Sequence, residues 1–507
     1  MKYVILCALF APIVYLALRQ KKWYLYLLFA FIGVLPEQFS IKLHDSIPLL
    51  SASRILILVL AGFWLFDKWK TRKIQFPKSL LIFFVINLII SLINLRYGMD
   101  DIKRIFLLIF ERVFLVIMLM DMIHDREEFH RCIDFAIMGC AALAVIGIIQ
   151  TVFNYDISSA LHLTKTITSI QLSDRMGLVR AFGTYNAISF GCYCAFMAML
   201  ILYRLYNTRS IWHSIAFALN FTALICTFTR SAWLCLAGIL FLAFLIYRLK
   251  LIRRLLPSGA MILALLVVLC CFQPKLYSAC VETGKSSINT VLGVLPDSVV
   301  SLFVSGDVES TDPSLQAPTL PDVEDPTTDT QTTTLPEETA PEEHYPGFEL
   351  DEGFGANAKD PTYSRTAQWT AVQYMKQEGT LLFGYGYNAL LHGRIHFFFD
   401  RWAGKWEPTT FLDVGIVAVI AESGLIGLLS YLGLLAYLAV VSFRKRSKSD
   451  KFDFYRLILL MIPLYLLLNI LAAFPNPSVV WLLFALFYAY KKLGKKESLP
   501  QDTNPEQ

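Results

Sequence analysis

The chain has little charge and none of the motifs that bind nucleotides. Only 17% of its 507 residues are charged, whereas about a quarter are charged in a typical soluble domain. It contains no Walker loop, no dinucleotide fingerprint and no Gly-x-Ser-x-Gly elbow. These absences give no support to ATP-driven transport. The small net charge of +5 requires no nucleic-acid partner.

The chain also lacks the cysteine pattern of a disulfide-stapled protein. It has ten cysteines, but nearly all of them lie within apolar segments or at their ends. Only Cys280 lies in a long polar segment, and that segment offers it no partner. The sequence therefore predicts no disulfide framework, and the cysteines are interpreted as small apolar packing residues.

Long apolar segments make up most of the chain. Hydrophobic residues reach 56%, the mean hydropathy is +0.54, and the apolar blocks are long enough to cross a bilayer as helices. We predict an all-α polytopic membrane protein with 12 to 14 transmembrane helices, of which 13 is preferred. The expected spans are 3–18, 23–37, 47–66, 78–95, 104–122, 132–153, 181–203, 210–228, 231–247, 255–273, 410–443, 456–473 and 478–490. The block 410–443 exceeds one span, so we expect a half-helix that breaks near Ser423-Gly424.

Lysine and arginine clusters occur in every second connection between these spans. The positive-inside rule places such connections in the cytoplasm. The first segment is expected to be a retained span rather than a signal peptide. The C-terminus is then cytoplasmic, and residues 154–180, 227–230 and 274–409 are extracytoplasmic. The clusters are Arg19/Lys21/Lys22, Lys68/Lys70/Arg72/Lys73, Arg126/Arg131, Arg204/Arg209, Arg248/Lys250/Arg253/Arg254, Arg444/Lys445/Arg446/Lys448/Lys451 and Lys491/Lys492/Lys495/Lys496.

Four regions follow from this pattern. We expect an N-terminal bundle (1–273), a large extracytoplasmic loop (274–409), C-terminal transmembrane helices (410–490) and a cytoplasmic tail (491–507). Within the loop, residues 305–347 are acidic and rich in Pro and Thr, which predicts a disordered tether. Residues 360–409 regain apolar and aromatic residues at roughly helical spacing, which predicts an ordered part made of a few helices.

Arginines at the predicted outer ends of spans are the first candidate site residues. Arg230 lies in Thr227-Phe-Thr-Arg-Ser, where it is either a snorkelling anchor or part of an anion site with Thr229 and neighbouring hydroxyls. Arg180 closes an external loop just before Tyr185 and Asn186. Together with Arg365 these arginines could form a shared phosphate site, because the planar guanidinium makes paired hydrogen bonds to phosphate.

Acidic residues and histidines form the second set of candidate site residues. Asp413 lies at the outer end of an apolar block, and it is either a general base or a helix cap. Glu422 lies deeper, and its expected role is structural. Glu111-Arg112 is interpreted as an internal charge pair. His392 and His396 have i, i+4 spacing without a following Glu, so we expect no metal site.

Four stretches in this order resemble the superfamily of bacterial O-antigen ligases and polysaccharide polymerases, across roughly residues 180–445. The stretches are Arg180-Ala-Phe-Gly-Thr-Tyr-Asn-Ala-Ile-Ser-Phe-Gly191, Thr227-Phe-Thr-Arg-Ser-Ala-Trp233, Arg365 through Trp369 to Gly386, and Asp413 through Ala421-Glu-Ser-Gly-Leu-Ile-Gly427. The resemblance implies a glycosyltransferase on the outer face of the bacterial cytoplasmic membrane. Its donor and acceptor would be oligosaccharides on polyprenyl (undecaprenyl) diphosphate, with no cofactor and no metal.

The resemblance also suggests roles for individual residues. Arginines that bind the diphosphate match Arg180 and Arg230, with Arg365 as a further candidate. Ligases carry a His-Asn pair where this chain has Asp413-Val414, and this difference favours the polymerase branch. Two alternatives stay open. One is a ligase that transfers finished glycan to a lipid or protein, and the other is a non-enzymatic glycolipid transporter or flippase.

Overall fold

The computed structural model describes the chain over residues 15, 19, 21–35, 40–41, 50–71, 76–95, 98–155, 172–173, 178–292, 367–386, 396–400, 405–408, 414–447, 452–471 and 477–497. It divides into two units, residues 1–285 with 362–507 and residues 286–361. The predicted acidic tether 305–347 lies outside the described residues, as do the predicted site residues Arg365 and Asp413.

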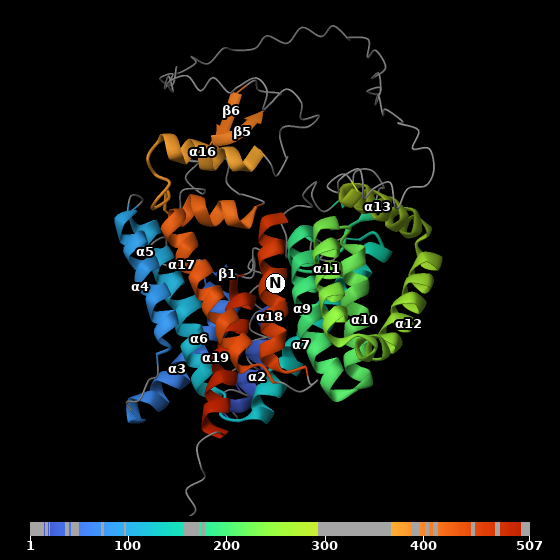
Figure 1. Ribbon diagram of the computed structural model, residues 1–507, viewed down its shortest axis with the longest axis horizontal. Helices are drawn as coiled ribbons and strands as arrows, with labels where there is room; N and C mark the ends of the chain where they lie inside the picture. The colour runs from blue at the N-terminus through green and yellow to red at the C-terminus, as the bar shows by residue number, and fades with distance from the viewer. Residues whose placement is uncertain are drawn as a thin grey trace, which may run out of the picture. The chain divides into compact units, whose positions relative to one another are not determined.

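The first unit is a helical bundle (Figure 1). Its N-terminal part contains α2 (Lys21–Phe31), α3 (Ala52–Thr71), α4 (Lys78–Ile93), α5 (Met99–Leu107), the π-helical stretch η1 (Leu108–Phe114), α6 (Leu115–Met122) and α7 (Arg126–Val152). The middle part contains α9 (Ala187–Thr208), α10 (Ile211–Cys226), α11 (Arg230–Tyr247), α12 (Leu249–Phe272) and the beginning of α13 (Pro274–Leu292). The C-terminal part contains the short helix η3 (Ala367–Trp369), α16 (Thr370–Gln377), α17 (Gly415–Lys445), α18 (Phe454–Leu471) and α19 (Pro477–Glu497).

Six of these helices are long and apolar enough to cross a membrane, which confirms a multi-pass α-helical membrane protein. They are α7, α9, α11, α12, α17 and α18, and the shorter helices α4 and α10 are also apolar. Every expected span from 23–37 onward overlaps a helix in the described residues, although residues 50–51 form a strand and α9 begins six residues after the start of the span 181–203. The exact number of crossings, 12 to 14, stays a prediction.

Helix α9 lies at the centre of the bundle. It is buried along almost its whole length and contacts α7, α10, α11 and α18. Its buried residues include Gly191, Cys192, Cys194, Ala195 and Ala198, and such small side chains let neighbouring backbones approach closely. Helix α12, by contrast, has most of its side chains on the outside of the bundle.

Strands are few and short in the described residues. β1 (Ser40–Ile41) pairs with β2 (Leu50–Ser51), and β3 (Leu172–Ser173) pairs with β4 (Leu178–Val179), both antiparallel. β5 (His396–Asp400) pairs with β6 (Lys405–Pro408), also antiparallel. We expected a few helices in residues 360–409, but the aromatic run that begins at His396 forms a strand. A run of five residues is too short for its periodicity to distinguish a strand from a helix. Aromatic residues favour strands, which explains the observed structure.

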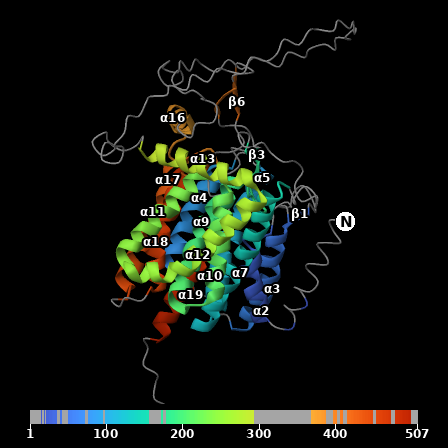
Figure 2. The same ribbon diagram turned by 90° about the vertical axis from the view of Figure 1, so that its right-hand side faces the viewer.

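The short elements between the acidic segment and α17 lie at one end of the bundle. Figure 1 shows α16, β5 and β6 at that end, next to the beginning of α17, and Figure 2 shows α16 and β6 there. Figure 2 shows β3 at the same end, and β3 pairs with the strand that precedes Arg180. We call this the Arg180 end.

Lysines from three of the basic clusters meet at the connection between α6 and α7. The Lys22 Nζ lies 2.6 Å from Glu128, and the Lys68 Nζ lies 2.7 Å from Asp121. Lys492 donates to the backbone carbonyl of Asp121 at 3.3 Å. The clusters that the sequence placed on one side of the membrane therefore share one end of the bundle.

Candidate functional site

Arg180 lies against the short turn between α10 and α11. Its Nε donates to the carbonyl of Thr227 at 2.8 Å, and its Nη2 donates to the Thr229 hydroxyl at 3.1 Å. The backbone is tied there as well, because the Ala181 amide donates to the Cys226 carbonyl at 2.9 Å. The structure thus brings together two segments that the sequence identified separately. A carbonyl and a hydroxyl orient a guanidinium group without cancelling its charge.

The turn itself has a strained backbone. Phe228, between the two threonines, has φ of +51°, a left-handed conformation that costs most side chains about 1 kcal/mol or more. Hydrogen bonds hold it, because the Thr229 amide donates to the Thr227 hydroxyl at 3.2 Å and the Thr229 hydroxyl donates to the Ala187 carbonyl at 3.2 Å. Strain of this kind often accompanies functional sites.

Gly191 of α9 makes room for this turn. A Cβ at this position would lie 2.9 Å from the Thr229 Cβ and 3.0 Å from the Thr227 hydroxyl oxygen. These separations are shorter than ordinary van der Waals contact, so a side chain here would displace the turn. The glycine that closes the first family-like stretch therefore sets the position of the second.

Helix α11 begins directly after this turn, so its N-terminus lies next to Arg180. Thr229 is the N-cap, Arg230 is the first helical residue and is exposed, and Ser231 follows in the first turn. The Ser231 side chain is buried, and its hydroxyl has no hydrogen-bond partner among the described residues. The N-terminal amides and the dipole of an 18-residue helix favour a negative charge here. This end of α11 can accept an anion, with a buried hydroxyl available to donate to it.

The side chains of Tyr185 and Asn186 make hydrogen bonds that hold the beginning of α9. The Asn186 side chain caps α9 by accepting from the Ser189 amide at 2.8 Å. The Tyr185 hydroxyl donates to the Gly33 carbonyl at 2.5 Å. These bonds explain why α9 begins at Ala187 rather than at residue 181, where the apolar run begins. They anchor the segment that carries Arg180.

The beginning of α17 is held by two neighbouring elements. The Val414 amide donates to the buried Gln368 side chain at 2.9 Å. A Cβ on Gly415 would lie 2.3 Å from the Asn469 Oδ1 of α18, so glycine is required for this packing. Gln368 follows Arg365 by three positions and Val414 follows Asp413 directly. The structure thus joins the sequence neighbours of these two predicted site residues.

Helix α17 is broken at Gly424, as we expected near Ser423-Gly424. Gly424 has φ of +67° and ψ of −172°, a conformation essentially confined to glycine. A loop over residues 381–386 supplies hydrogen bonds at the break. The Tyr385 amide donates to the Ala421 carbonyl at 2.8 Å, and the Leu425 amide donates to the Leu381 carbonyl at 2.9 Å. Figure 1 shows the first part of α17 lying across the end of the bundle and the rest running along it.

Glu422 lies just before this break. Its carbonyl accepts from the Gly386 amide at 3.1 Å, and its side chain is half-buried. The backbone bond fits the structural role that we expected for it. Nearby, the Asn94 side chain donates to the Phe383 carbonyl at 2.7 Å and so ties the loop to the end of α4.

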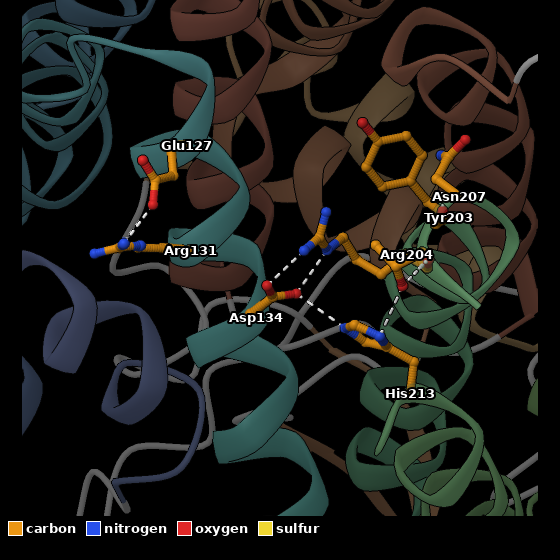
Figure 3. A network of polar contacts seen from close by, with 8 residues as sticks. Glu127, Arg131, Asp134, Tyr203, Arg204, Asn207 and His213 are labelled. Atoms are coloured by element: carbon orange, nitrogen blue, oxygen red, sulfur yellow. Dashed lines mark hydrogen bonds and ion pairs between the residues drawn. The ribbon is translucent and has the colours of Figure 1, made fainter. Parts of the chain in front are cut away.

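Sequence reasoning missed a charged cluster at the opposite end of α9 (Figure 3). Asp134 of α7 accepts two hydrogen bonds of 2.6 Å from Arg204 of α9. The His213 Nε2 of α10 lies 3.0 Å from the same carboxylate, and its Nδ1 lies 3.0 Å from the Thr208 hydroxyl. Arg204 follows Ala187 by 17 positions in one helix, which separates this cluster from the Arg180 turn by about 25 Å. The sequence did contain one indication of this cluster, because Asp134 is a carboxylate two turns inside a largely apolar helix.

Glu111 has a partner that the sequence did not predict. It pairs with Arg54 of α3, and both side chains are largely buried. The bond crosses from the π-helical stretch η1 to a neighbouring helix. Glu111 therefore joins two helices, whereas we expected an internal pair with Arg112.

The described residues contain no group of three or more His, Cys, Asp or Glu side chains that could hold a metal ion. His392 lies outside the described residues. No family model, no curated protein and no solved structure matches this chain.

Proposed function

We propose that the protein is a membrane glycosyltransferase that polymerises polyprenyl-diphosphate-linked oligosaccharide repeat units on the outer face of the bacterial cytoplasmic membrane. The observation that carries the proposal is the contact of Arg180 with the turn that leads into Arg230. Two arginine-bearing segments meet there at the N-terminus of a helix, beside the buried Ser231 hydroxyl. This combination favours a phosphate-bearing ligand.

The reaction needs positive charge where the diphosphate leaves. A hydroxyl of one lipid-linked unit attacks the anomeric carbon of the other, a new C–O bond forms, and the bond to the diphosphate oxygen breaks. The diphosphate leaves with the electron pair, and Arg180, Arg230 and Arg365 stabilise its charge. Asp413 takes the proton of the attacking hydroxyl as general base. The chemistry requires neither a nucleotide nor a metal.

The orientation of the protein in the membrane follows in this proposal from the distribution of lysine and arginine along the chain. The end that carries the lysine clusters faces the cytoplasm in this proposal, together with the C-terminus, and the Arg180 end faces outward. A flippase would deliver the lipid-linked units to that face, and a chain-length regulator would act with the polymerase. Membrane lipid surrounds the exposed apolar side chains of α12.

The decisive experiment is glycan profiling of the cell surface in a deletion strain complemented with variants. Arg230→Ala should abolish long polymer while the protein remains in the membrane. Asp413→Asn should do the same, because it removes the base and keeps the size of the side chain. Arg131→Ala is the matched control, since this exposed arginine lies on the same helix as Asp134 at the opposite end. Long glycan in the Arg230→Ala strain would show that the arginine has no such role.

The pattern of glycan lengths distinguishes a polymerase from a ligase. A polymerase produces a ladder of chain lengths, and its loss leaves single repeat units. A ligase leaves the ladder intact on the lipid carrier and abolishes only its attachment to the final acceptor.

A further inference from the structure

Two amide side chains at the end of α7 hold the backbone on both sides of Arg180. The Asn154 Oδ1 accepts from the Val179 amide at 2.7 Å, on the N-terminal side of the arginine. The Gln150 Oε1 accepts from the Phe182 amide at 3.2 Å and from the Gly183 amide at 2.8 Å, on the C-terminal side. The Gln150 Nε2 also donates to the Gly183 carbonyl at 3.0 Å.

These four hydrogen bonds hold three residues of the segment, Val179, Phe182 and Gly183. Gln150 is fully buried and lies one helical turn before Asn154. The five-residue segment from Val179 to Gly183 is therefore fixed at both ends by one helix. Its only side chain long enough to reach the α10–α11 turn with a charge is that of Arg180, which makes the contacts at Thr227 and Thr229.

We infer that Gln150 and Asn154 are positioning residues that pre-orient Arg180 for the diphosphate. This inference rests on the proposed function. A guanidinium that is already oriented loses less conformational freedom when an anion binds, so binding is tighter. Release of either end of the segment should weaken anion binding, although neither amide needs to contact the ligand.

Asn154 provides the cleaner variants because it is exposed and has φ of +50°. Asn154→Gly accepts this backbone conformation and removes the acceptor oxygen. Asn154→Asp keeps an acceptor oxygen in the same place and also tolerates the conformation. Gln150→Met removes the three side-chain hydrogen bonds to Phe182 and Gly183 with little change in size. Asn207→Ala is the matched control, because Asn207 is an exposed amide near the opposite end of α9 that donates to the Phe452 carbonyl at 2.8 Å.

The experiment measures binding of inorganic diphosphate to the full-length protein in lipid nanodiscs by titration calorimetry. Wild type and Asn207→Ala should bind with similar affinity, and Asn154→Asp should keep the slow exchange of the Val179 amide although its negative charge repels the ligand. Asn154→Gly and Gln150→Met should bind about tenfold more weakly, the size expected when one or two hydrogen bonds that order the site are lost. Hydrogen exchange should show faster exchange of the Val179 amide in Asn154→Gly and of the Gly183 amide in Gln150→Met.

The outcomes separate the two levels of inference. If wild type does not bind diphosphate, the proposed anion site itself is wrong, whatever the variants do. If wild type binds and Asn154→Gly binds equally well although the Val179 amide exchanges faster, the site stands and the positioning role is wrong. If the Val179 amide exchanges equally fast in Asn154→Gly and Asn154→Asp, the acceptor oxygen does not hold this segment, and the positioning role is again wrong.

Discussion

The described contacts at the Arg180 turn and at the break in α17 are mainly made by backbone groups and glycines, whereas those at the opposite end of the bundle include several ion pairs between side chains. Arg180 donates to a carbonyl and a hydroxyl, and the break in α17 is bridged by backbone amides of residues 381–386. At the other end Arg204 pairs with Asp134, Lys68 with Asp121 and Lys22 with Glu128.

This difference has a physical consequence for what each end can bind. A carboxylate partner neutralises a guanidinium and leaves little field for a ligand, whereas neutral oxygen atoms orient it and keep its positive charge. The ion-paired end is therefore suited to holding helices together. At the Arg180 turn, the N-terminus of α11 and the exposed side chain of Arg230 favour the binding of an anion.

The largest expected effect is on activity at the Arg180 end. Arg180→Ala should lower polymer synthesis about 100-fold or more, since a donor aimed at a developing charge contributes that much in comparable sites. The thermal midpoint of the purified protein should change little, because the Thr227 carbonyl and the Thr229 hydroxyl that lose a hydrogen bond carry no charge. Glycan profiling and a thermal melt in detergent measure the two quantities. An unfolded Arg180→Ala protein would contradict the division between the two ends.

The second effect is on stability, at the break in α17. Gly424→Ala forces a side chain into a conformation confined to glycine and places its Cβ 2.2 Å from the Leu382 carbonyl oxygen. We expect a loss of about 3 kcal/mol or more, measured as a lower thermal midpoint and lower membrane yield.

Gly433→Ala is the control on the same helix, because a Cβ at Gly433 meets nothing within 4 Å. It should leave the midpoint unchanged or raise it, since alanine is the better helix former. Equal behaviour of the two variants would mean that the break is not a fixed part of the fold.

Much of the fold and part of the site follow from the sequence. Apolar length predicts the spans, and the break in α17 is predicted by Gly424 beside Ser423 within a run too long for one crossing. The arginine segments were also identified, because a charge at the end of an apolar run is visible without coordinates. The spans, the break and the terminal arginines could all be predicted because each depends only on residues that are close together in the chain.

The remainder depends on contacts between residues far apart in the chain. Asp134, Arg204 and His213 lie on three different helices, and nothing in the local sequence indicates that they meet. Gln150 was overlooked for the same reason, since its bonds reach residues more than 30 positions away. The strand β5 was missed because a short aromatic run fits both strand and helix.

The third effect tests the ion-paired end. Asp134→Leu removes both hydrogen bonds of Arg204, whose side chain is only 11% exposed, while that of Asp134 is 32% exposed. We expect a loss of about 2 kcal/mol, below the range for fully buried pairs because water reaches the carboxylate. The double variant Asp134→Leu with Arg204→Leu should recover part of that loss, since no buried guanidinium is left without a partner, although the His213 Nε2 still lacks its contact with Asp134. Thermal melts of the two single variants and the double variant measure the coupling, and simple additivity would show that the two residues do not stabilise the helices as a pair.

The smallest effect is expected at Glu127 and Arg131, which pair one turn apart on α7 near that cluster (Figure 3). Their side chains are 72% and 54% exposed, so water and salt screen the attraction. Glu127→Gln should shift stability by about 0.5 kcal/mol or less, and added salt should reduce even that difference. Glu127 and Asp134 both accept from an arginine at the same end of the bundle, but the pair of Glu127 is exposed and that of Asp134 is largely buried. A comparison of the two variants therefore distinguishes the effect of charge from the effect of burial. A thermal shift in Glu127→Gln as large as that in Asp134→Leu would mean that net charge, rather than buried pairing between helices, stabilises this end.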